Sequence, residues 1–213
     1  SRGWQEVADI GPGDQMGLAR RVPALHQPVL RSPEQILLLA HLLMAGRWTG
    51  ERSVRYATRF QLNGEAVARA GRQLGFRVER IDGVRSGFHY LITDRAMQRR
   101  SGVAARGLGA LGISQCLPEL RELPPEVFQF DDEQISQLLR HLWAAGGIVQ
   151  VRGPVTARSG VRVSFSTLSE RLAQQVSALL LRIGIIARGG AAQQRSGQIV
   201  FSIDISDPLA QRV

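Results

Sequence analysis

The stretch Leu38–Gly46, LLAHLLMAG, and its counterpart Leu138–Gly147, LLRHLWAAGG, decide the fold of this chain. Each stretch is apolar on nearly every side, which predicts a helix that is buried around most of its circumference. Glycine follows the last helical residues in both, as is common at helix C-termini. His41 and His141 stand at matching positions, and we interpret both as buried, hydrogen-bonded core residues.

The order of patterns after the first helix recurs after the second. Strand-like alternation at Val54–Phe60 and at Val161–Phe165 precedes a further helix in each copy. The spacing between matching positions is 101 residues for Gly46 and Gly147, 107 for Val54 and Val161, 109 for Gly75 and Gly184, and 110 for Gly87 and Gly197. Because small loop insertions produce such a drift, we predict an α+β fold of two α-β-β-α-β-β repeats, at about residues 33–120 and 131–213.

Local signals place several other elements. Ser32-Pro33 and Asp131 are typical of helix N-termini. The segments Gly64–Leu74 and Ser169–Ile183 are predicted helices, and Val7–Ile10 is a predicted short strand.

The composition favours a polyanionic partner. The formal net charge is +9, and every basic residue is Arg, which binds phosphates and guanine edges in a bidentate way that Lys does not. Codon bias in a GC-rich genome is the alternative explanation for the absence of Lys. A charge excess of this size favours nucleic acid over a membrane surface.

Two classes of protein are excluded at this point. No run of 18 apolar residues is present, so we expect no membrane span and a cytoplasmic protein. Cys116 is the only cysteine, which excludes an internal disulfide and a cysteine-based zinc cluster.

The two apolar helices resemble the paired LAGLIDADG helices of intein homing endonucleases, especially those in replicative DNA helicase (DnaB) inteins. The resemblance extends to Gly3–Pro23, which is similar to part of an intein splicing domain, to Leu108–Gly112 and Leu123–Phe128 in the linker, and to Ser166–Ile185 in the second repeat. It implies a remnant of a splicing domain at residues 1–31, a first repeat with its linker at 32–123, and a second repeat at 124–213.

The family resemblance also implies a mechanism. The two helices pack side by side between the halves of a pseudo-symmetric monomer, and the sheets form a saddle in the major groove of double-stranded DNA. An acidic residue at the foot of each helix binds Mg²⁺, and the metals support phosphodiester hydrolysis. A flanking splicing domain and a host helicase would be further partners.

This sequence differs from the family at the catalytic positions. The family aspartates align with Ala45 and Gly146, the two catalytic positions, and neither residue has a side-chain oxygen. We therefore predict that hydrolysis is lost and expect no metal or other cofactor, with Mg²⁺ needed only if nuclease activity persists. Glu51 is the first acid after Ala45, and its placement makes it a poor replacement. Met44 stands where the family often has Gly, and we expect it to push the helices apart.

Strand alternation identifies the residues that would bind DNA. We place Arg55, Arg59, Arg162 and Ser164 on the strand faces turned away from the core. Further candidates for the same role are Arg47, Arg77, His89, Gln150, Arg152 and Gln198. Arg52, Arg85 and Arg158 lie in predicted loops and would meet phosphate instead. The alternative for each of these residues is an ordinary solvated surface.

Two other functions stay open on the sequence alone. One is an active, Mg²⁺-dependent, site-specific homing endonuclease that uses other acids. The other is a structural insertion in an intein or helicase that has no role with DNA. We do not expect the chain to splice by itself, because it lacks both an N-terminal nucleophile block and a terminal His-Asn pair.

Overall fold

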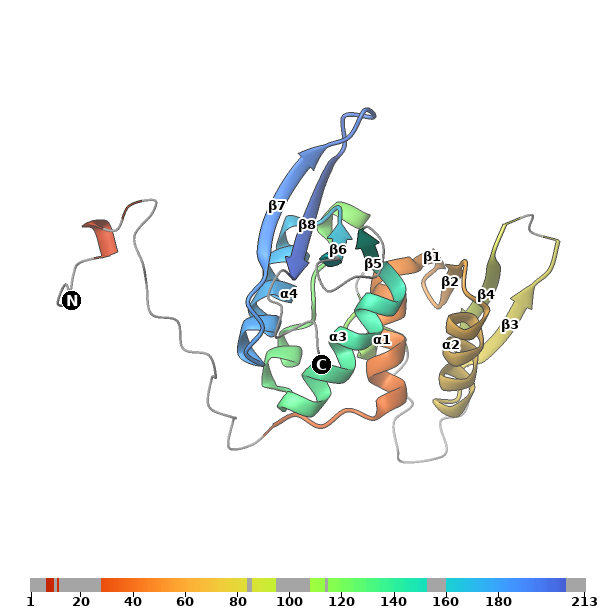
Figure 1. Ribbon diagram of the computed structural model, residues 1–213. Coiled ribbons are helices and arrows are strands. Elements are labelled where there is room, and N and C mark those ends of the chain that lie inside the picture. The colour runs from red at the N-terminus through yellow and green to blue at the C-terminus, as the bar shows by residue number, and fades with distance from the viewer. Residues whose placement is uncertain are drawn as a thin grey trace.

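The computed structural model describes residues 7–9, 11, 28–83, 86–94, 108–113, 115–152 and 160–205. Two helices, α1 (Pro33–Ala45) and α3 (Asp132–Gly146), lie side by side at the centre (Figure 1). A four-stranded antiparallel sheet and one further helix follow each of them along the chain.

The two halves have the same topology. After α1 come β1 (Gly46–Gly50), β2 (Ser53–Thr58), α2 (Gln61–Gln73), β3 (Arg77–Ile81) and β4 (Phe88–Thr93), with the sheet order β1-β2-β4-β3. After α3 come β5 (Gly147–Arg152), β6 (Gly160–Thr167), α4 (Glu170–Arg182), β7 (Arg188–Gln193) and β8 (Ile199–Ile205), with the order β5-β6-β8-β7. The predicted α+β fold with two αββαββ repeats is therefore confirmed. Short 3-10 turns occupy Val7–Asp9, Leu108–Leu111, Pro118–Leu120 and Pro125–Gln129.

The central helices begin and end as the sequence predicts. The Ser32 hydroxyl accepts a hydrogen bond from the Gln35 amide, and the Gln35 side chain accepts one from the Ser32 amide. Asp131 caps α3 by accepting from the Gln134 amide at 2.8 Å. At the other end, the amides of Gly46 and Gly147 donate to the carbonyls of Leu42 and Trp143, so Ala45 and Gly146 are equivalent last residues.

This equivalence corrects the predicted register of the histidines. The helix ends match at a spacing of 101 residues, whereas His41 and His141 are 100 residues apart. The residue that corresponds to His41 is Leu142. The two rings still meet, with centroids 5.7 Å apart, because they lie on facing helices.

The strand register corrects the predicted gradual increase in the spacing between matching residues of the two repeats. Gly46 pairs with Tyr56, ten residues later, and Gly147 pairs with Phe165, eighteen residues later. The β5–β6 hairpin is therefore eight residues longer than the β1–β2 hairpin, and Val54 corresponds to Val163 rather than to Val161. The spacing between matching residues rises from 101 to 109 at this hairpin. It rises again to 113 between β7 and β8, where Ile203 corresponds to Tyr90.

Several predicted boundaries were wrong for local reasons. Strand β2 ends at Thr58 and α2 begins at Gln61, because Phe60 has the extended backbone of the residue before the helix. The strands β1 and β7 lack alternating sequences and were missed. Val7–Asp9 forms a 3-10 turn, whose hydrogen bond is local, rather than a strand, which needs a partner. Of residues 1–31, the expected remnant of a splicing domain, the structure describes only 7–9, 11 and 28–31.

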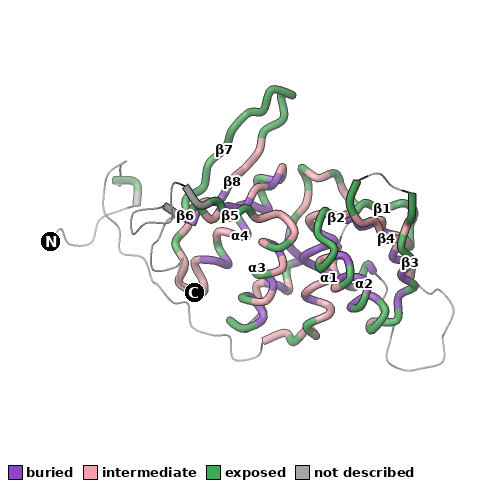
Figure 2. Tube along the Cα trace, turned by 45° about the vertical axis from the view of Figure 1, so that its right-hand side comes forward, coloured by how far each residue is buried: buried purple, intermediate pink, exposed green. Residues whose placement is uncertain are grey.

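The hydrophobic core is continuous across both halves. Seven of the eight α1 residues from Ile36 to Leu43 are buried, with Leu37 the exception, and six of them belong to the core together with the inner faces of both sheets. Figure 2 shows buried residues along the central helices and an exposed β7–β8 hairpin. Within the described part of the chain, no helix has the length and apolar character needed to cross a bilayer.

We expect Leu138→Ala, at a fully buried position of α3, to lower the free energy of unfolding by about 2–5 kcal/mol, because it removes core packing between the halves. Leu62→Ala, at a position that is 80% exposed, is the matched control and should cost less than about 0.5 kcal/mol. Urea denaturation measures both. Equal effects would show that the helix pair is not the core of the fold.

Candidate nucleic-acid interface

One face of the first sheet is turned away from the core and is rich in arginine. Because directly paired residues share a face, the register of Arg47 with Arg55, and of Arg77 with Thr93 and Ser53, places the three arginines on the same side. The opposite side carries the buried residues Val54, Tyr56, Tyr90 and Ile92. His89, which pairs with Ala57, also belongs to the outward face.

Two of these side chains are held in place by each other. Arg55 Nη2 lies 3.3 Å from His89 Nδ1, and His89 Nε2 lies 2.8 Å from the Ser86 carbonyl. Since a carbonyl only accepts, Nε2 carries the proton and Nδ1 accepts from Arg55, which requires a neutral imidazole. Arg77 lies 2.6 Å from Glu79, two residues along the same face, so its charge is partly neutralised.

Arg59 lies elsewhere than the sequence predicts. It follows the end of β2 and is exposed in the connection to α2, where it lines a hollow together with Ala45. It is therefore placed beside the helix ends rather than on the strand face.

The outward face of the second sheet has more evenly balanced charges. Gln150 pairs with Arg162, and both are exposed. Arg162 donates to both carboxylate oxygens of Asp204, at 3.0 and 2.8 Å, and this pairing raises the pKa of Arg162. Ser164 is on the same face by register, but only 8% of it is exposed, so little of it is open to a partner.

The remaining candidates are distributed more widely. Arg152 is the last residue of β5 and pairs with Gly160. Gln198 precedes β8, and its side chain donates to Glu119 at 3.2 Å. Of the loop arginines, Arg52 lies 3.9 Å from Asp94, whereas Arg85 and Arg158 lie outside the described residues.

Arg188 was missed by sequence reasoning. It pairs with Asp204 and so shares the outward face of Ser164 and Arg162. The residues after it, Gly189-Gly190-Ala191-Ala192, have too little side chain to show alternation. Among the side chains that the structure describes, the outward face of the second sheet carries Arg162 and Arg188 together with Asp204.

Two hollows lie beside the helix ends, one lined by the first sheet alone and the other by both sheets. One, of about 420 Å³, includes Ala45, Ala57 and Ala145 in its lining, and the other, of about 400 Å³, includes Met44, Ala45 and Ala57. None of the described residues that line either hollow carries a carboxylate. Glu51 lies in the turn beyond β1, about 20 Å from the helix end at Ala45 at roughly 3.3 Å per strand residue, so it does not replace an acid at Ala45.

The donor set in these hollows does not fit a divalent cation. Mg²⁺ and Mn²⁺ are held by carboxylates, and the oxygens here belong to hydroxyls and backbone carbonyls. Among the residues that the structure describes, no group of three or more His, Cys, Asp and Glu side chains is arranged to hold a metal.

Met44 fills the space that a side chain at position 146 would need. A Cβ added to Gly146 would lie 2.5 Å from Met44 Cε. The flexible Met44 thioether therefore occupies the gap that Gly146 leaves opposite it.

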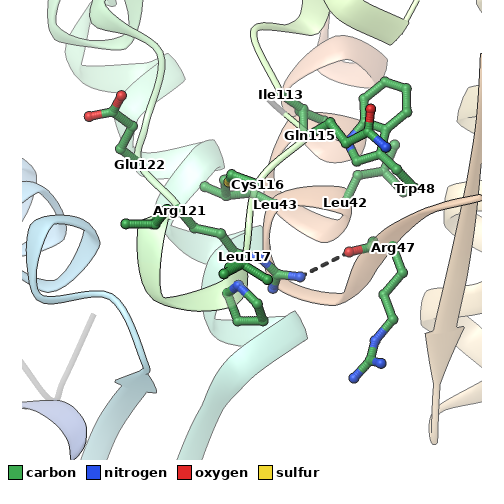
Figure 3. Close-up of a pocket in the computed structure, with 13 residues that line it drawn as sticks. Leu42, Leu43, Arg47, Trp48, Ile113, Gln115, Cys116, Leu117, Arg121 and Glu122 are labelled. Carbon is green, nitrogen blue, oxygen red and sulfur yellow. Dashed lines mark hydrogen bonds between the residues drawn. The ribbon is translucent and has the colours of Figure 1, made fainter. Parts of the chain in front are cut away.

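A guanidinium lies at the end of α1. Arg121, in the linker, donates to the backbone carbonyls of Met44 and of Gly46, the latter at 2.9 Å. Figure 3 shows the second of these hydrogen bonds. Burial lowers the pKa of Arg121. No sequence motif marks this residue, because the contact spans 75 positions and depends on the fold.

His41 forms a buried polar pair with Tyr56. Its Nδ1 lies 2.9 Å from the Tyr56 hydroxyl, and His41 is 1% exposed, as the core interpretation predicts. Burial, and then the proximity of His141, lower the pKa of His41 to about 4, while burial raises that of Tyr56 to about 12. His141 is only partly buried, and its pKa is lowered by burial and by Arg140. The corresponding pair in the second half is apolar, Leu142 and Phe165.

The paired central helices and the two pseudo-symmetric sheets define the fold of LAGLIDADG homing endonucleases. Full-length DUF199/WhiA from Thermatoga maritima has this fold with a TM-score of 0.54 at 13% identity, covering 89% of this chain and 55% of that protein. The homing endonuclease I-DmoI, in complex with DNA and Mn, gives a TM-score of 0.50 at 13% identity, covering 84% of this chain and 92% of that one.

A family model described as a LAGLIDADG-like domain matches residues 133–206. The replicative DNA helicase DnaB of Rhodothermus marinus is 31% identical over 218 residues, covering 96% of this chain and 22% of the helicase. The DnaB of Nostoc sp. is 28% identical over 189 residues, covering 87% of this chain and 21% of that protein. The chain thus spans about a fifth of the length of these relatives.

The His41–Tyr56 pair makes stability depend on pH. Because the pKa of His41 falls from 6.5 to about 4 on folding, the unfolded chain takes up a proton that the folded chain does not. We expect the free energy of unfolding to fall by up to about 3 kcal/mol as the pH drops from about 6.5 to 4. The double variant His41→Leu with Tyr56→Phe, which copies the second half, should lack this part of the decrease.

Urea denaturation of both proteins at pH 7 and pH 4.5 measures the difference. Carboxylates titrate in both proteins and cancel in the comparison. An identical pH dependence in the two proteins would contradict a neutral buried His41.

Proposed function

We propose that this chain is an intein-borne LAGLIDADG domain that binds double-stranded DNA along its outward sheet faces and no longer hydrolyses it. The main observation behind this proposal is that the two helix ends lack acidic side chains. Both helices end on residues without a side-chain oxygen, Ala45 and Gly146. The two hollows that Ala45 lines have no carboxylate among their described lining residues.

The charge distribution supports DNA binding. The first sheet presents Arg47, Arg55 and Arg77 on one side, against a single acid, Glu79. Arginine on a sheet that enters the major groove donates in pairs to guanine edges and to phosphates. I-DmoI, which shares the fold, is a DNA-bound relative in the solved structures.

The chemistry of the helix ends supports the loss of cleavage. Hydrolysis by metal-bound water needs anionic ligands that hold the cation and keep its water in line with the phosphate. Hydroxyls and carbonyls do not supply that charge. The hollow beside Met44 instead contains the guanidinium of Arg121.

The match to DnaB helicases supports a host context. It covers 96% of this chain but only a fifth of the helicase sequence, as expected for an element inserted in a larger protein. In this proposal the flanking splicing domain and the host helicase are partners outside the chain. The two fused halves act as a pseudo-symmetric monomer, in the cytoplasm.

DNA binding is tested with a duplex from a DnaB gene that lacks the insertion. We expect salt-sensitive binding in a mobility-shift assay, and a loss of about fivefold or more in affinity for Arg55→Gln. Arg69→Gln, on the exposed side of α2, is the matched control and should bind like the unaltered protein. Absence of binding at low salt would favour a structural insertion and contradict the proposal.

The loss of cleavage is tested with the same duplex in Mg²⁺ and in Mn²⁺. The unaltered chain should make no double-strand break, and Ala45→Asp with Gly146→Asp and Met44→Gly should regain cleavage. The variant that keeps Met44 should regain less, because the thioether occupies the space of the second aspartate. Cleavage by the unaltered chain would instead identify an active endonuclease.

A further inference from the structure

Arg121 is placed at the negative end of α1. It donates to the carbonyls of Met44 and Gly46, which flank the position of the missing acid at Ala45. The C-terminal end of a helix carries partial negative charge, which stabilises a cation there. Two of the five guanidinium N–H groups are used by these carbonyls, and the others are left to meet a ligand.

The backbone around Arg121 is fixed by α4. The Arg121 carbonyl accepts a hydrogen bond from the Ser169 hydroxyl at 2.6 Å. Two residues later, the Leu123 amide donates to buried Gln175 at 2.7 Å, and the Gln175 side chain donates back to the Leu123 carbonyl at 3.4 Å. Arg121 therefore connects α4 of the second half to α1 of the first, and its position does not depend on a bound ligand.

A second arginine faces the same hollow. Arg47 and Arg121 both line the space of about 400 Å³ that also includes Ala57 and Ser166 of the outward sheet faces. The charge of Arg47 opposes that of Arg121 and contributes to lowering the pKa of Arg121, after burial. No ion pair joins either guanidinium to a carboxylate in the described part of the chain. Glu119, the acid that acts on Arg121, accepts a hydrogen bond from Gln198.

Among the described residues that line this hollow, Arg47 and Arg121 are charged and none is an acid, so the hollow attracts an anion. We propose that Arg121, together with Arg47, binds a backbone phosphate of DNA at the base of the helix pair, as a fixed cation in the place of a divalent metal. Arginine donates to phosphate oxygens in a planar fork, but it holds no water that can become a nucleophile. This site would hold a phosphodiester without cleaving it, and it rests on the proposed DNA binding.

The first test is the affinity of Arg121→Gln for the same duplex in EDTA. We expect a loss of at least about fivefold and a salt dependence reduced by about one phosphate contact. Arg121→Lys keeps the charge but not the planar pair of donors, so its affinity should lie between those of the unaltered chain and Arg121→Gln. The affinity of Arg69→Gln should be unchanged. Thermal unfolding of each variant shows whether it is folded at the assay temperature.

The second test needs no DNA. In the Met44→Gly, Ala45→Asp, Gly146→Asp background, calorimetric titration with Mn²⁺ is compared with and without Arg121→Gln. Because a fixed cation opposes a second one, we expect removal of Arg121 to raise the Mn²⁺ affinity roughly tenfold.

The outcomes separate the two proposals. If the unaltered chain does not bind the duplex, the proposed function fails. If it binds and Arg121→Gln binds equally well, the phosphate site is wrong while DNA binding stands. Equal Mn²⁺ affinity with and without Arg121 would contradict the proposal that its guanidinium takes the place of a divalent metal.

Discussion

The packing of α1 against α3 is the contact on which the rest of the structure depends. It joins the two halves of the core and holds the two sheets in a fixed relation (Figure 1). It also brings Ala45 and Gly146 to the same end of the molecule. Whatever residues occupy those ends face the space between the sheets, so small changes there alter the chemistry without altering the fold.

The residues at the two helix ends fit together as a group. Gly146 leaves room that Met44 fills, and the carbonyls around Ala45 are held by Arg121. The described lining of the hollow beside Met44 has no carboxylate, and Arg47 and Arg121 give it a positive charge. Such a charge attracts phosphate directly, and the proposed DNA binding without cleavage rests on it.

The sequence predicted what depends on local chemistry. The caps at Ser32 and Asp131, the repeat topology and the outward face with Arg55 follow from periodicity and short-range hydrogen bonding. The sequence did not predict the eight-residue difference between hairpins, which shifted the register of the second repeat, or the burial of Ser164. Arg121 was missed for the same reason, since its partners are more than 70 residues away and only the fold brings them together.

A crystal structure of the chain bound to its duplex in Mn²⁺, with anomalous data at the manganese edge, tests the central claim most directly. The account predicts a phosphate oxygen within hydrogen-bond distance of Arg121 and no anomalous peak at the ends of α1 and α3. A manganese peak between Ala45 and Gly146, bridging protein oxygens and the DNA backbone, would contradict it.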